Sequence, residues 1–221
     1  MDILSGSWPG EIYFFSRRPN GTYGAPKQLR YASGSKIKVG SASAVAVSDW
    51  NHDTLPDLLV GDIGGFVHLI PNSGSPKKPS FQKAKRLKAG GRVIKVPGGD
   101  AGPAVADWDQ DGLQDLIVGT GKGDVIWYRN TRSPSDPELA AGIHLVKPTA
   151  VNSNDVQSFN NPTGSGSRTK LSIADWNQDG ELDLIVGDFN SIRVGSGSKY
   201  HGWVWVYLRK SERQTTTPDL N

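Results

Sequence analysis

The sequence predicts an all-β protein, and more narrowly a β-propeller, or a segment of one, built from four-stranded antiparallel blades. Three observations lead to this fold class. The composition is rich in turn-forming residues, with 27 Gly and 14 Pro in 221 residues. An acidic motif recurs three times, and short apolar strand-like runs surround each copy. Four short strands in a repeat of roughly 40–60 residues is the pattern of one propeller blade.

Each repeat unit has the order strand, acidic loop, strand, glycine turn, strand, proline-containing connection, strand. The runs before the acidic loops are "SAVAVSDW", "GPAVADWD" and "KLSIADWN", and those after them are "DLLVGD", "DLIVGT" and "DLIVGD". A glycine turn then leads to "GFVHLIPN", "GDVIWYRN" or "GWVWVYLR". The first two units close on "AKRLKAG" and "GIHLVKP". Alternating apolar residues place one face of each strand in a core, which favours antiparallel sheets.

The repeat predicts two complete and two incomplete blades within one domain, residues 1–210. The expected blades are residues 2–34 (partial), 40–90, 100–148 and 168–210 (partial), followed by a polar tail over 211–221. Asp2 stands where the last residue of an acidic loop would be, and the final unit has no fourth strand. A Ser/Asn/Gly-rich surface loop is expected over 151–169. Because open sheet edges can pair, we expect further blades or self-association to complete the propeller ring.

The three acidic loops place side-chain oxygens at positions one, three, five and nine, and a backbone carbonyl at position seven. The predicted metal ligands are Asp49, Asn51, Asp53, Leu55 and Asp57 in the first loop, Asp107, Asp109, Asp111, Leu113 and Asp115 in the second, and Asp175, Asn177, Asp179, Glu181 and Asp183 in the third. Carboxylates this close repel one another without a counter-charge. Calcium takes about six to eight oxygen ligands, and magnesium requires a stricter octahedron. The loops therefore predict two to three calcium ions.

Two other interpretations of the loops were weighed. A helix–loop–helix calcium hand needs Glu at position twelve, where this chain has Val60, Val118 and Val186 between strand-like flanks. A set of Asx-turns without an ion is the remaining alternative. Charge count ranks the second loop as the tightest site. The first is expected to be the weakest, because β-branched Thr54 replaces the turn glycine and Pro56 follows, and whether it is occupied stays open.

The aromatic residues are expected to pack in the core between blades more than to contact a ligand. Trp50, Trp108 and Trp176 each follow the first loop aspartate and are expected to pack between blades. In "GWVWVYL", the residues Trp203, Trp205 and Tyr207 share one strand face, as either an inter-blade stripe or a sugar-stacking platform.

Several function classes have no support in the sequence. Cysteine is absent, the four histidines lack metal-ligand spacing, and no nucleophile or phosphate-binding motif occurs. The net charge of +3 is scattered, which argues against a nucleic-acid partner. No apolar run is long enough for membrane insertion. We therefore expect a non-enzymatic module, and no export signal is recognisable in residues 1–15.

The three D-x-[DN]-x-D-x-x-x-D loops, the "DL[IL]VG" that follows and the glycine turn resemble the FG-GAP or VCBS repeats of integrin-α-like β-propellers. The resemblance extends from Asp2 to about Arg209, with departures at Thr54 and Pro56 and in the incomplete end blades. It implies calcium in the hairpin between the first two strands of a blade. It also implies an extracellular, periplasmic or cell-surface location.

The expected function is a non-catalytic calcium-binding module that presents loops to a carbohydrate or protein partner, as in cell adhesion. Two alternatives stay open. One is a fragment of a polysaccharide lyase or another polysaccharide-active enzyme, whose groove residues could be Arg168, Lys170, Asp100 and Lys122. The other is a purely structural domain of a surface protein.

Overall fold

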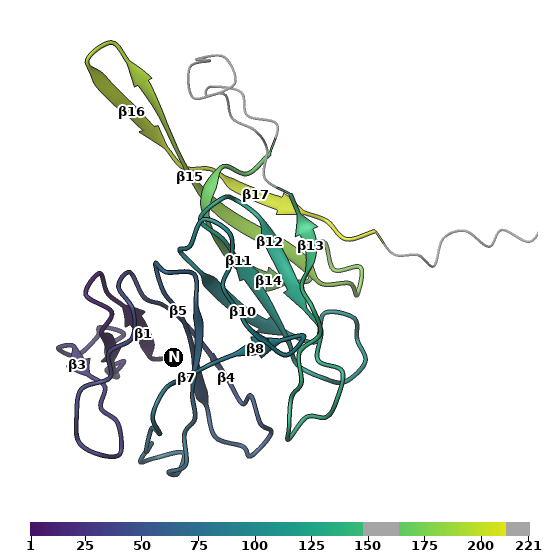
Figure 1. Cartoon of the computed structure of the whole chain (residues 1–221). Coiled ribbons are helices and arrows are strands. Elements are labelled where there is room, and N and C mark those ends of the chain that lie inside the picture. The colour runs from purple at the N-terminus through teal and green to yellow at the C-terminus, as the bar shows by residue number, and fades with distance from the viewer. Residues whose placement is uncertain (148–163, 211–221) are drawn as a thin grey trace, which may run out of the picture.

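A computed structural model describes residues 1–147 and 164–210, which form four antiparallel sheets arranged as the blades of a propeller (Figure 1). No helix occurs among these residues. The all-β propeller prediction, with two complete and two incomplete blades, is therefore confirmed. The expected polar tail and most of the expected surface loop over 151–169 lie outside the described residues.

The strands follow the predicted repeat. Blade 1 contains β1 (Ile3–Gly6), β2 (Ile12–Phe15) and β3 (Lys27–Gln28). Blade 2 contains β4 (Ala44–Ser48), β5 (Asp57–Gly61), β6 (Val67–Ile70) and β7 (Lys85–Arg86). Blade 3 contains β10 (Gly102–Ala106), β11 (Asp115–Gly119), β12 (Val125–Tyr128) and β13 (Ile143–Val146). Blade 4 contains β14 (Ser167–Ala174), β15 (Asp183–Val194), β16 (Gly197–His201) and β17 (Val204–Tyr207). A separate hairpin, β8 (Lys88–Ala89) with β9 (Arg92–Val93), lies between blades 2 and 3 in the chain.

Each acidic loop joins the first two strands of the sheet in blades 2, 3 and 4. The register pairs Ser48 with Asp57 in blade 2, Ala106 with Asp115 in blade 3 and Ala174 with Asp183 in blade 4. The ninth loop residue is thus already the first residue of the second strand. This register fixes the three loops at the same end of their sheets.

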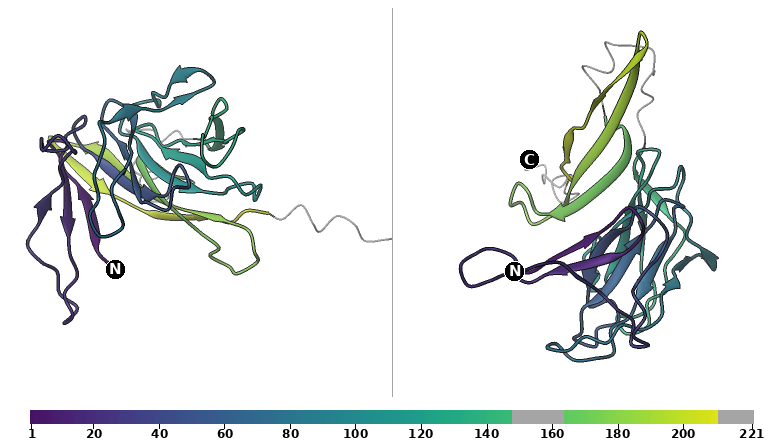
Figure 2. Two further views of the ribbon diagram at one scale, coloured as in Figure 1. Left: turned by 90° about the horizontal axis from the view of Figure 1, so that it is seen from below. Right: turned by 90° about the vertical axis from the view of Figure 1, so that its left-hand side faces the viewer.

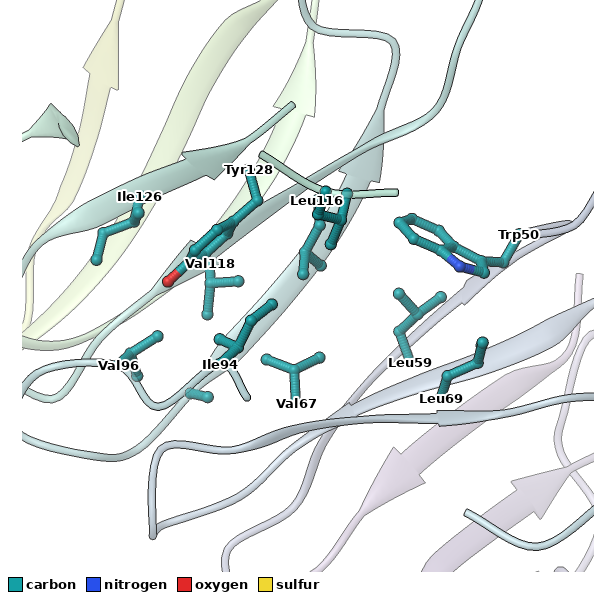
Figure 3. Packing of buried hydrophobic residues seen from close by; sticks show 12 residues of the cluster. Trp50, Leu59, Val67, Leu69, Ile94, Val96, Leu116, Val118, Ile126 and Tyr128 are labelled. Carbon is teal, nitrogen blue, oxygen red and sulfur yellow. The ribbon is translucent and has the colours of Figure 1, made fainter. Parts of the chain in front are cut away.

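Three hydrophobic clusters hold neighbouring blades together. Figure 3 shows the cluster between blades 2 and 3, where Leu59 and Trp50 meet Leu116 and Val118. Ile117, the alternate residue of the same strand, belongs instead to the cluster between blades 3 and 4. Because successive strand residues point to opposite faces, the "LIV" run packs against both neighbours at once.

The glycine that ends the second strand allows two blades to approach closely. A Cβ on Gly61 would lie 2.1 Å from the Ala101 carbonyl oxygen, and one on Gly119 would lie 2.3 Å from the Thr169 carbonyl oxygen. On Gly187 of blade 4 the nearest atom would be 3.8 Å away, which is ordinary contact. The glycine is therefore required where another blade follows.

Blade 4 differs from the prediction between its second and third strands. The sequence predicts a glycine turn there, but β15 continues to Val194 and pairs with β16, so a hairpin projects beyond the sheet (Figures 1 and 2). Gly195 adopts a φ of 60°, which a tight two-residue hairpin turn requires. Beyond the hairpin, β17 pairs with β15 in the register that β12 has with β11, so the predicted third strand of the blade is confirmed.

The tryptophans follow the blade order. Trp50 and Trp108 are buried in inter-blade clusters, which confirms their predicted packing role. Trp176 is 60% exposed, since no described blade follows blade 4. Trp205 and Tyr207 pack against the cluster between blades 3 and 4, as the inter-blade interpretation expects, whereas Trp203 remains exposed.

Candidate metal centre

The first residue of each acidic loop organises the loop backbone. Asp107 Oδ1 accepts a hydrogen bond from the Asp111 amide at 3.0 Å, and its Oδ2 accepts one from the Gly112 amide at 2.9 Å. Asp49 and Asp175 accept the same two bonds in the first and third loops, at 2.9–3.0 Å. The three loops therefore share one backbone trace.

That trace places positions four and six in the left-handed region. The φ angles are 54°, 59° and 61° at His52, Gln110 and Gln178. At position six they are 88° for Gly112 and 89° for Gly180, and Thr54 is held at 71°. A non-glycine residue in this region is strained by about 1–2 kcal/mol. The first loop therefore has the same backbone conformation as the other two, but with strain at Thr54. It is also the loop that the sequence predicts to be the weakest site.

Side-chain oxygens converge most closely in the second loop. One carboxylate oxygen from each of Asp107, Asp109 and Asp111 lies within 4.8 Å of the other two. In the first and third loops, position three is an asparagine. Asn51 Nδ2 donates to Asp53 Oδ2 at 2.9 Å, and Asn177 Nδ2 donates to Asp179 Oδ2 at the same distance. The sequence-predicted residues at positions one, three and five are therefore neighbours in all three loops.

The aspartate at position nine lies beneath each loop and holds the third strand of its blade. Asp57 Oδ1 and Asp115 Oδ1 accept the amides of Asn72 and Asn130, both at 2.7 Å. Asp183 Oδ1 accepts the Arg209 amide at 2.8 Å. All three aspartates are fully buried, and none is in the second-loop cluster of three carboxylates.

Burial dominates the electrostatics of position nine. It raises the pKa of Asp57 and of Asp115, against the opposing effect of the Asn72 and Asn130 amides. By contrast, the Glu181 amide and the Asn177 side chain lower the pKa of exposed Asp179. Position nine is therefore a buried carboxylate that a nearby cation would stabilise in its charged form.

The donor set fits a hard cation. Asp57 Oδ2 and Asp109 Oδ1 are buried from solvent and have no hydrogen-bond partner. Asx-turns alone explain the backbone bonds of positions one and five but leave these two oxygens unsatisfied, and such atoms are destabilising. An ion in the first loop would use Asp57 Oδ2, and an ion in the second loop would use Asp109 Oδ1. The position-seven residues Leu55, Leu113 and Glu181 donate their amides to position five at 2.9 Å, and their carbonyls stay predicted ligands.

Neighbouring loops also contact one another, which the sequence did not indicate. Gln110 Nε2 donates to the Gly180 carbonyl at 3.0 Å and lies 3.3 Å from Glu181 Oε2. Ser48, just before the first loop, is hydrogen-bonded to Gln114 of the second loop. These contacts cross the blade interfaces and link neighbouring loops.

Basic side chains near the second and third loops were also missed. Arg129 pairs with Asp109 and Asp111 through Nε and Nη2 at 2.5 and 2.9 Å. The hydrogen bond to Asp111 and the charge of Asp109 raise its pKa. Arg209 lies over the Trp108 ring at 5.1 Å and 3.6 Å from Glu181. No repeat signal could reveal either residue, because neither recurs in the other units.

A second polar cluster lies at the opposite end of β14. Lys170 Nζ is 3.0 Å from Asp100 Oδ1, and Arg168 Nε is 3.8 Å from Asp100 Oδ2. Asp100 and Arg168 both have left-handed φ angles, 53° and 54°. Arg168 also lies 5.7 Å from the Phe189 ring, which stacks on Tyr200 at 5.8 Å. Three of the four expected groove residues thus meet, as an ion-paired cluster.

Fold and loops together define a propeller whose blades 2, 3 and 4 carry an acidic loop between their first two strands, and comparison with known proteins agrees. Residues 107–186 match the family model of the FG-GAP-like repeat, a region that includes the second and third acidic loops. Over 134 residues the chain is 28% identical to integrin alpha-3 of Cricetulus griseus, a match that covers 55% of this chain and 12% of the integrin.

The chain is therefore similar to FG-GAP-like repeats over residues 107–186 and to part of an integrin alpha chain. It spans only a small part of the integrin that it matches. Within the part that the structure describes, no helix has the length and apolarity needed to cross a membrane.

Proposed function

We propose that this chain is a calcium-stabilised, non-catalytic propeller module that works outside the cytosol and presents loops to a carbohydrate or protein partner. One observation carries the calcium proposal. Three loops with one backbone trace gather acidic side chains, and the buried oxygens of Asp57 and Asp109 have no hydrogen-bond partner. A hard divalent cation satisfies such oxygens.

The ion would act mainly on stability. Asp107 and Asp111 would bind it at positions one and five, and Asp115 would support the site from below. Each bound ion would offset carboxylate repulsion within one hairpin and reinforce the contacts between Gln110 and the third loop. Extracellular calcium modules bind with dissociation constants of about 10⁻⁴–10⁻³ M, above resting cytosolic levels. This range and the integrin likeness support an extracellular location.

The test is thermal unfolding in millimolar calcium, in millimolar magnesium and in chelator. We expect calcium to raise the melting temperature and magnesium to have little effect. The double substitution D107N/D111N should remove most of the increase. Asp136→Asn is the matched control, because this carboxylate lies outside the loops and pairs only with Arg132. Equal shifts in the control and in the double variant, or none in the wild type, would refute the calcium proposal.

Carbohydrate binding is supported by aromatic side chains at the end of blade 4 opposite the acidic loops. Tyr200 is 66% exposed and stacks on Phe189, and Trp203 is also exposed. Exposed ring faces suit the apolar faces of sugars. A glycan array in calcium and in chelator tests this role, with Tyr200→Ala as the variant.

The array also separates the alternatives. Binding without loss of substrate supports a binding module, whereas new unsaturated sugar ends would identify a lyase. If no glycan binds in calcium or in chelator, while calcium still raises the melting temperature, a purely structural domain or a protein partner would be favoured.

A further inference from the structure

In the second acidic loop an arginine pairs with the carboxylates at positions three and five, a contact that the described residues do not repeat in the first and third loops. Arg129 Nε is 2.5 Å from Asp109 Oδ2, and Nη2 is 2.9 Å from Asp111 Oδ2. In the other loops the position-three asparagine donates to the position-five carboxylate. Asp109 cannot donate in this way once ionised. Arg129 therefore supplies the hydrogen bond that asparagine supplies elsewhere, and its charge balances the additional carboxylate.

The repeat fixes which residues correspond to Arg129. Arg129 immediately precedes Asn130, whose amide binds the position-nine Asp115. Pro71 stands in the same relation to the first loop, and Leu208 to the third. Neither Pro nor Leu carries a charge, so this cation is specific to the loop with four aspartates.

We propose that Arg129 sets the calcium affinity of the second loop by competing with the ion for the oxygens of Asp109 and Asp111. The inference rests on the proposed calcium function. The guanidinium uses one oxygen of each carboxylate, and a fixed positive charge at this distance repels a divalent ion. Its side chain is 46% exposed, so it can withdraw into solvent when the ion binds.

This competition changes the affinity ranking that charge count predicts. Four aspartates alone would make the second loop the tightest site, but one of the four negative charges is already balanced by Arg129. The second loop then presents about the same net charge as the third, where Asn177 replaces Asp109. We expect the two loops to bind calcium with similar affinity in the wild-type chain.

The loops can be observed separately in one sample. The sequence contains two Asp–Gly pairs, Asp111–Gly112 and Asp179–Gly180. Labelling aspartate carbonyls with ¹³C and glycine amides with ¹⁵N therefore gives one correlated NMR signal for the second loop and one for the third. Both glycine amides donate to the position-one carboxylate of their loop, so each signal reports its own site. Asp179→Glu removes the third-loop signal and assigns both.

Calcium titrations of wild type and Arg129→Gln test the proposal. Removing the charge should lower the second-loop midpoint about tenfold, because an exposed charge pair is partly screened. The third-loop midpoint should not change. Arg129→Lys keeps the charge and should stay closer to wild type, although lysine does not reproduce the two-pronged contact.

The reciprocal substitution is Leu208→Arg at the corresponding, exposed position of the third loop. It should raise the third-loop midpoint and leave the second loop unchanged. It also keeps the test decisive if Arg129→Gln does not fold. An unchanged or weakened second loop in Arg129→Gln, or an unaffected third loop in Leu208→Arg, would overturn the proposal. If neither signal responds to calcium in the wild type, the calcium function itself fails, which is a different result.

Discussion

Replacing Asp115 by asparagine should destabilise the chain even when no calcium is available. Its Oδ1 accepts the Asn130 amide at 2.7 Å, and its Oδ2 accepts Trp127 Nε1 at 2.9 Å and the Trp108 amide at 3.2 Å. An asparagine side chain has one oxygen and one NH₂ group. Whichever way it turns, the NH₂ group faces at least one N–H donor, and a buried donor loses its acceptor.

The magnitude follows from the number of donors. If the asparagine oxygen accepts from Trp127 and Trp108, one donor is left unsatisfied; if it accepts from the Asn130 amide, two are. Each costs about 1–3 kcal/mol. The substitution also removes a carboxylate whose charge is disfavoured by burial, because burial raises the pKa of Asp115, and this recovers part of the lost free energy. We expect a net loss of about 2–3 kcal/mol in the free energy of unfolding.

Asp57→Asn is the matched control. Asp57 Oδ1 accepts the Asn72 amide, whereas its Oδ2 has no hydrogen bond of normal geometry and faces no tryptophan side-chain donor, although the Trp50 amide also acts on this carboxylate, so an NH₂ group there costs less than in Asp115→Asn. Urea unfolding of both variants in chelator should show Asp115→Asn clearly less stable and Asp57→Asn within about 1 kcal/mol of wild type. Equal destabilisation of the two variants would refute the assignment of these hydrogen bonds.

Three further predictions concern the glycine, the strained threonine and pH. Gly119→Ala should cost about 3 kcal/mol, because its Cβ meets the Thr169 carbonyl at 2.3 Å, whereas Gly187→Ala should be nearly neutral in the same unfolding assay. Thr54→Gly should stabilise the chain by about 1 kcal/mol and strengthen calcium binding at the first loop, since φ is 71° there; a loss of stability would contradict this. Burial raises the pKa of Asp57, so in chelator the native state keeps the proton of this carboxyl to a higher pH than the unfolded state does. The stability that protonated Asp57 contributes is therefore lost as pH rises from about 4 through the folded pKa. Asp57→Asn should remove that part of the fall, and an unchanged pH profile would contradict it.

The sequence was sufficient for the blades because the same physical pattern is written several times. A run such as "DLIVG" has alternating faces that must both be buried, and this is satisfied by a central strand between two neighbouring blades. The repeat located the acidic loops for the same reason. The repeat does not predict which blades pack side by side. The close approach of Gly119 to Thr169 and the exposure of Trp176 both depend on that packing.

The projecting hairpin of blade 4 was missed although a signal was present. Val194 and Gly197 pair across Gly195 and Ser196, and a Gly-Ser pair suits a two-residue hairpin turn. The surrounding "VGSGSKY" was interpreted as a turn because glycine and serine have low strand propensity. Tertiary pairing with the long β15 outweighs that preference. The hairpin carries Tyr200, so the error concerned a candidate binding surface.

The position-nine aspartate shows that two functions occupy one motif. Asp2 has the place of position nine in blade 1, and its Oδ1 accepts the Arg17 amide at 2.7 Å, as Asp57 accepts Asn72 and Asp115 accepts Asn130. Together with the bond from Arg209 to Asp183, this bond between position nine and the end of the third strand is common to the four described blades. Position one has no such bond to the third strand, because its partners lie within the loop itself, and positions three and five of the second loop pair instead with the Arg129 side chain. Substituting position one, three or five should therefore leave the bond to the third strand in place, whereas substituting position nine should remove it.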